Sequence, residues 1–77
     1  MSEANFAARL REARAGRHLS QRALGAKVGL GHPIILRIEA GTRHVILDEA
    51  IAIANALDVP LIRMLTDEPI TAEVTLT

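Results

Sequence analysis

The sequence predicts a small all-α domain of five short helices, followed by a C-terminal extended or β segment. Three observations support this prediction. Hydrophobic residues make up 49% of the 77 residues and are mainly Ala, Leu and Ile, with Phe6 as the only aromatic; Ala and Leu favour helices. The apolar residues recur at helical spacing. Ser, Gly and Pro stand where such helices would begin and end, and the length allows only one domain.

The first helix is expected to begin after a cap at Ser2 or Asn5 and to run to about Ala15, with Gly16 as its end. Apolar residues at i, i+4 and i+7 give it one buried face. These residues are Phe6, Leu10 and Ala13. Three arginines lie outside this stripe and are expected on the surface. They are Arg9, Arg11 and Arg14.

The second helix is expected over about Gln21–Val28, because Ser20 is a good N-cap. The glycines of Gly29–Leu30–Gly31 predict a tight break. A third helix follows over about His32–Ala40, and Pro33 lies in its first turn, where a missing N–H costs nothing. Its inward-facing residues are Ile35 and Ile38.

The fourth helix is expected over about Leu47–Leu57, with acidic residues favourably placed in its first turn. Its predicted apolar stripe is Ala50, Ile51, Ala54 and Leu57. Pro60 opens a short fifth helix from Leu61 to about Thr66. We therefore assign residues 1–66 to the folded domain and residues 67–77 to a tail.

Residues 70–77 of this tail alternate between apolar and polar side chains, which is typical of a half-buried strand. A single strand in a helical domain has no partner within its own chain. Pairing with the same strand of a second copy, about a two-fold axis, would give it one. The dimer residues would then be Ile70, Ala72, Val74 and Leu76. An extended tail lying on the fourth helix is the alternative.

The charges are balanced in number but divided along the chain. Nine Lys and Arg residues match nine Asp and Glu residues. Up to Val45 there are eight basic and three acidic residues, whereas the remainder has one basic and six acidic residues. The first part is therefore a candidate surface for an anionic partner.

The segment Ser20–Gly41 reads SQRALGAKVGLGHPIILRIEAG. It resembles the helix-turn-helix of the lambda-repressor-like (Xre/Cro type) transcription regulators, and the similarity extends over roughly residues 6–65. The match includes Gln21 at the start of the second helix, the small Gly25, Gly29 at the turn, and the ending RIEAGTR. The resemblance implies a five-helix DNA-binding fold in which the third helix enters the major groove.

Candidate DNA contacts follow from these positions. Arg37 is the best candidate for a base edge, because a guanidinium can donate two hydrogen bonds to guanine O6 and N7. The resemblance implies that Gln21 contacts phosphate, and Ile34 is a candidate for a thymine methyl group. The full set is Gln21, Arg22, His32, Pro33, Ile34, Arg37, Arg43 and His44.

The same resemblance implies a structural ion pair between Arg14 in the first helix and Glu39 at the end of the third. The chain departs from the family where Gly31, Leu36 and Ile46 replace the Ser or Thr of many members. The run Ile34–Leu36 places three apolar residues on a helix that should contact DNA. At least one of them is then exposed, as a thymine contact or as a surface that a partner covers.

Other chemistries have little support. Cysteine is absent and the three histidines are far apart in sequence, so we expect no metal site and no cofactor. Phosphate loops and catalytic serine motifs are absent as well, and we do not expect an enzyme. We expect a cytoplasmic, sequence-specific DNA-binding regulator, a repressor that binds a palindromic operator as a homodimer. The alternative is a protein-interaction module, such as an antitoxin or controller protein whose tail binds a partner protein.

Overall fold

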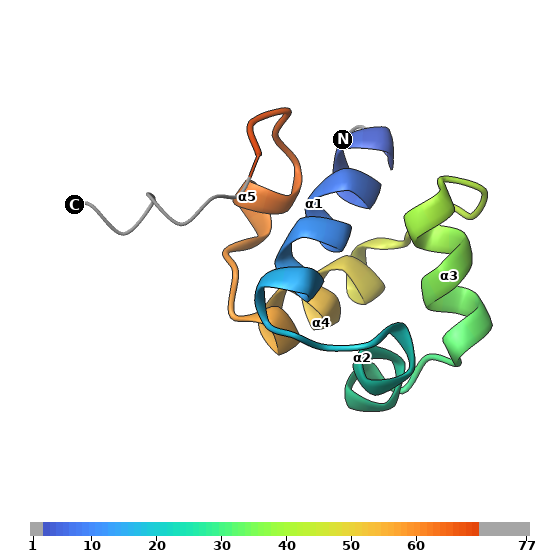
Figure 1. Cartoon of the computed structure of the whole chain (residues 1–77). Coiled ribbons are helices and arrows are strands. Elements are labelled where there is room, and N and C mark those ends of the chain that lie inside the picture. The colour runs from blue at the N-terminus through green and yellow to red at the C-terminus, as the bar shows by residue number, and fades with distance from the viewer. Residues whose placement is uncertain (1–2, 70–77) are drawn as a thin grey trace.

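The computed structural model describes residues 3–69, and this part of the chain contains five helices and no strand (Figure 1). The helices are α1 (Glu3–Gly16), α2 (Gln21–Val28), α3 (His32–Ala40), α4 (Leu47–Leu57) and α5 (Leu61–Met64). The all-α prediction is confirmed, and the bounds of α2, α3 and α4 are those expected. α5 ends two residues earlier than predicted. The predicted strand, with Ile70, Ala72, Val74 and Leu76, lies outside the described residues.

The helices pack so that α3 lies at one edge of the bundle and α5 at the other (Figure 1). α1 contacts both of them, α2 packs against α3 and α4, and α4 packs against α5. The central position of α1 and α4 leaves one side of α3 open to solvent.

Aliphatic side chains from all five helices, together with Phe6, form one core. Its largest fully buried members are Phe6, Leu10, Leu24, Ile35, Ile38, Ile53, Leu57 and Met64. The predicted stripe of α4 was wrong at one position, because Ile53 is buried while Ile51 is 40% exposed. Ile53 shares a face with Ala50, Ala54 and Leu57 at i, i+3, i+4 and i+7 spacing, whereas Ile51 lies about 100° from Ala50 around the helix.

Local backbone chemistry fixes the connection between α2 and α3. The Ser20 hydroxyl caps α2 by accepting from Ala23 N at 2.9 Å, as predicted. Gly29 has φ +74°, in the left-handed region that favours glycine. A Cβ on Gly25 would collide with the backbone oxygen of Leu30, so the turn requires glycine there as well. The connection between the two helices therefore lies in direct backbone contact with α2.

Arg9 is a second correction, because it is buried rather than on the surface. Its guanidinium donates to both carboxylate oxygens of Glu12 at 2.8 Å and to the carbonyl oxygen of Thr66 at 2.8 Å. The hydrogen bonds to Glu12 raise the pKa of Arg9. A long cationic side chain can cover apolar surface with its stem while its head finds partners. Arg9 thus connects α1 to the segment that follows α5.

Candidate nucleic-acid interface

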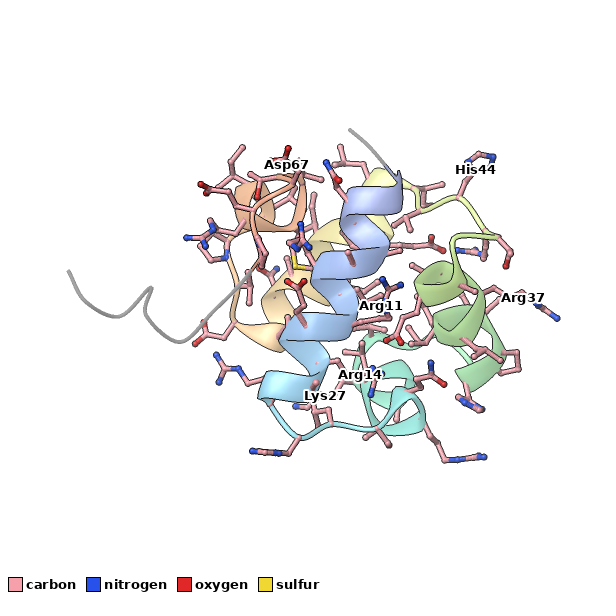
Figure 2. All side chains as sticks on the ribbon, turned by 45° about the horizontal axis from the view of Figure 1, so that its top comes forward. Arg11, Arg14, Lys27, Arg37, His44 and Asp67 are labelled. Atoms are coloured by element: carbon pink, nitrogen blue, oxygen red, sulfur yellow. The ribbon has the colours of Figure 1, made fainter. Side chains whose placement is uncertain are left out.

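The two faces of α3 differ sharply in burial. Ile35, Ile38 and Glu39 face the interior and are almost fully buried. The opposite face consists of exposed residues at i, i+3, i+4 and i+7 spacing. They are Pro33, Leu36, Arg37 and Ala40. The Arg37 side chain extends away from the body of the molecule, beyond the rim of α3 (Figure 2).

A buried carboxylate holds the inner face of α3 against α1. Glu39 is only 4% exposed. Arg14 donates to it from Nε and also from Nη2 at 3.0 Å, and its Nη1 donates to the carbonyl oxygen of Leu19 at 2.9 Å. The hydrogen bonds to Glu39 raise the pKa of Arg14. Arg11 donates to the backbone oxygen of Glu39. The end of α3 is therefore fixed by two arginines of α1.

The same carboxylate also orders the start of α2 and α3. Gln21 Nε2 donates to Glu39 Oε1 at 3.0 Å, which leaves Gln21 Oε1 to accept from His32 Nε2 at 3.1 Å. Because an ionised carboxylate only accepts, this geometry fixes the orientation of the Gln21 amide. His32 must then carry a proton on Nε2. Both side chains are half-buried, so a chain of hydrogen bonds runs from Arg14 to the first residue of α3.

Arg43 and His44 lie in the loop between α3 and α4. The Arg43 guanidinium donates to the two Glu49 carboxylate oxygens at 2.8 and 3.0 Å. This pair lowers the pKa of Glu49 and raises that of Arg43. Glu49 Oε1 also accepts a hydrogen bond from Ile46 N. This bond caps the start of α4, where the Ile46 side chain offers no acceptor of its own. To bind a phosphate, Arg43 would have to give up its ion pair with the Glu49 carboxylate. The exposed His44 ring points outward (Figure 2).

The three residues of the run Ile34–Leu36 differ in how deeply they are buried. Ile35 is fully buried, and the half-buried Ile34 packs against the core. Leu36 is the large apolar residue that α3 leaves in solvent, at 48% exposure. Leu36 is thus better placed than Ile34 to touch a partner.

Ion pairs inside the described part of the chain account for half of the basic residues up to Val45. The pairs join Arg9 to Glu12, Arg14 to Glu39, Arg17 to Asp58 and Arg43 to Glu49. The other four form no ion pair with a carboxylate among the described side chains of residues 5–69. They are Arg11, Arg22, Lys27 and Arg37. Arg22 and Lys27 are exposed on α2 and Arg37 on α3, so the uncompensated charge gathers on the helix-turn-helix.

Two features of this surface were not predicted from the sequence. Arg11 was expected only as a surface charge, yet it reaches the Glu39 carbonyl 28 residues away. Leu36 was not singled out as the exposed member of its run. Helical spacing was a usable signal for Leu36, since it lies beside Arg37 and three residues from Pro33 on the outer face.

Two further features bear on other classes of function. Residues 3–69 contain no group of three or more His, Asp or Glu side chains placed to hold a metal ion. None of the described helices combines the length and apolar character needed to cross a bilayer.

Comparisons with known proteins bear on the family and the fold of the chain. A family model described as helix-turn-helix matches residues 10–63. The restriction–modification controller protein C.AhdI from Aeromonas hydrophila is 33% identical, with a TM-score of 0.78 over 82% of this chain and 91% of that one. A hypothetical transcription factor, NHTF from Neisseria, shares the fold at 24% identity and a TM-score of 0.81, over 97% of this chain and 84% of that one. A search of curated proteins found no significant match.

The family match covers most of the chain and includes the whole of α2 and α3. The resemblance that the segment Ser20–Gly41 indicated is therefore confirmed. Proteins of this family act by binding DNA rather than by catalysis. The chain belongs to the helix-turn-helix family of lambda-repressor-like (Xre/Cro type) DNA-binding transcription regulators.

Proposed function

We propose that the protein is a sequence-specific repressor that binds a palindromic operator as a homodimer. Each protomer would place the outer face of α3 in a major groove, and the two half-sites would be about 34 Å apart. The observation that carries the proposal is the outer face of α3, where Arg37 extends into solvent (Figure 2) and forms no ion pair with the described carboxylates of residues 5–69.

The proposed contacts divide into positioning and reading. Arg22 on α2 is exposed and suited to a phosphate, whereas Arg37 is suited to guanine. Gln21 bonds to both His32 and Glu39, so the remaining polar atoms of Gln21 and His32 would meet DNA in a fixed orientation. Such pre-organisation reduces the ordering cost of binding. Pro33, Arg43 and His44 remain candidate contacts at the two ends of this surface.

The outer face of α4 supports a homodimer. Ile46, Leu47 and Ile51 are 60%, 61% and 40% exposed, on a helix whose other side is already buried in the core. A helix that is apolar on both sides is typical of one with two packed faces. A two-fold axis beside this face would bury the same residues from each protomer. The tail strand is a second candidate interface, and it lies outside the described residues.

The likeness to C.AhdI, a restriction–modification controller protein, supports a regulatory function for this small domain. We propose that the protein acts in the cytoplasm, on a promoter that carries its operator. Repression would follow where the operator overlaps the promoter.

In vitro selection from random DNA duplexes, followed by fluorescence anisotropy, tests this function. We expect a palindromic sequence bound at least about 1,000-fold more tightly than random duplex, with affinity that falls steeply as salt rises. A reporter carrying that sequence over its promoter should lose expression when the protein is present. Failure to select any sequence would contradict specific binding, and increased expression would contradict a repressor.

Light scattering of the whole chain tests the homodimer. We expect a dimer that survives removal of residues 67–77 if α4 forms the interface. Loss of the dimer on truncation would assign the interface to the tail instead.

A further inference from the structure

The outer face of α3 combines one cation with a continuous apolar surface. Pro33, Leu36 and Ala40 are exposed together with Arg37, and none of the three apolar residues can form a side-chain hydrogen bond. Beside this face, Gln21 and His32 bond to each other and Glu39 is buried. Among the four residues of the face, only Arg37 can read a base by a side-chain hydrogen bond.

The major groove offers an apolar group that such a face can recognise. Thymine presents its C5-methyl group there, and cytosine methylated at C5 presents the same group. Leu36 and Arg37 are adjacent in the chain, while Pro33 and Leu36 are neighbours on the helix surface. A guanine bound by Arg37 would thus bring a nearby pyrimidine C5 within the reach of Leu36.

We propose that Leu36 is a specificity-determining residue that recognises the C5-methyl group of a pyrimidine near the guanine read by Arg37. This inference rests on the proposed function, because it requires α3 to lie in the major groove of a preferred sequence. It departs from the expectation for Ile34, whose half-buried side chain packs on the core and is less available to DNA.

The preference for a methylated base would come from removing the apolar surfaces of both Leu36 and the C5-methyl group from water. Leu36 is 48% exposed in the free protein, so burying this exposed surface against DNA would favour binding. Burial of one methyl-sized group changes an equilibrium constant by about fourfold. Thymine should therefore be preferred over uracil by about fourfold at one position of each half-site.

The experiment uses the selected duplex and removes single methyl groups from the DNA. Each thymine is replaced in turn by uracil, and in a second series each cytosine is replaced by 5-methylcytosine. Binding by the whole chain is measured by anisotropy at about 50 mM salt, where phosphate contacts keep weak variants measurable. The proteins are wild type, Leu36→Ala, Leu36→Met and, as a matched control, Ile62→Ala. Ile62 is 66% exposed on α5, away from α3.

We expect one thymine-to-uracil position to cost wild type about fourfold and Leu36→Ala nothing. Leu36→Met and Ile62→Ala should retain the wild-type discrimination. A Leu36-dependent gain from 5-methylcytosine would also support the proposal, with methylated cytosine as the source of the group. Equal effects in wild type and Leu36→Ala, or no effect of either base change, would overturn it. If no duplex can be selected at all, the proposed function itself fails.

Discussion

α3 and α4 both leave large aliphatic side chains in solvent, but the charges beside them have opposite signs. On α3, Leu36 stands next to Arg37, whereas on α4 the exposed Leu47 and Ile51 flank Asp48. A phosphate backbone attracts the first kind of face and repels the second. The contrast indicates that the α3 face suits DNA and that the α4 face suits a protein surface, which in the proposed dimer is a second copy of the chain.

The two helices also differ in how their inner faces are held. α4 packs through aliphatic side chains, while α3 adds the buried Glu39 and its hydrogen bonds to Arg14 and Gln21. A buried carboxylate with several hydrogen-bond partners fixes the orientation of its helix and also holds the helix against its neighbours. This difference fits a helix whose outer side chains must meet a partner in one geometry.

The largest expected effect comes from removing the anchor of α3. Glu39→Ala leaves the Arg14 guanidinium without its partner in a partly buried site, and the free energy of unfolding should fall by about 3 kcal/mol. Urea denaturation followed by circular dichroism measures this change. The control is Arg17→Ala, which breaks an exposed pair with Asp58 and should cost less than about 1 kcal/mol. Similar losses in both variants would show that Glu39 is not a special anchor.

The next effect concerns the α4 face. Leu47→Asp places a charge in the proposed dimer contact and should weaken the dimer by about 1.5–3 kcal/mol, or more than tenfold in dissociation constant. Sedimentation equilibrium gives this constant directly. Leu36→Asp is the matched control on α3 and should leave the dimer intact. A dimer that is weakened equally by both substitutions would remove the distinction between the faces.

Arg37→Ala tests the α3 face from the side of the DNA. It should cost about 1–3 kcal/mol of discrimination at one G·C pair, because only that pair loses its bidentate contact. Arg22→Ala should instead weaken all sequences to a similar degree and reduce the salt dependence. Anisotropy titrations against the selected duplex and single-pair variants separate the two. If both substitutions behave alike, the division between reading and positioning is wrong.

The bounds of these helices could be predicted from the sequence, but which face of α4 is buried could not. Ser20, Gly29 and Gly41 mark helix ends through local backbone chemistry, so the bounds of α2 and α3 followed from the residues themselves. The stripe of α4 was harder, because an almost wholly apolar helix offers two faces of similar character. Only packing against α2 and α5 decides that Ile53 is inside and Ile51 outside.

Side-chain partners across the fold were the least predictable. Arg9, Arg11 and Arg14 are close together in sequence, yet one reaches the Thr66 carbonyl and the other two reach Glu39. Long cationic side chains have many rotamers, and distant elements determine which one is used. Arg14 was assigned in advance through a family resemblance rather than through its local pattern. The sequence gives no comparable signal for Arg9 or Arg11.

The smallest expected effect lies in the loop that joins the two faces, where Arg43 pairs with Glu49. Because the pair lowers the Glu49 pKa in the fold, its contribution to stability is fully present above the unfolded value of about 4.3 and is lost as pH falls through the folded value. The difference in unfolding free energy between wild type and Glu49→Gln should therefore be constant near neutral pH and should shrink in acid.

Urea denaturation across this pH range measures that difference, and the Arg43→Ala background provides the control. Most of the pH-dependent part should vanish there, leaving the smaller contribution of the bond from Ile46 N to Glu49. A difference that persists unchanged without Arg43 would mean that the helix cap, rather than the ion pair, lowers the Glu49 pKa. In that case Arg43 would be free to bind phosphate without giving up a stabilising partner, and the loop would belong with the α3 face rather than stand between the two.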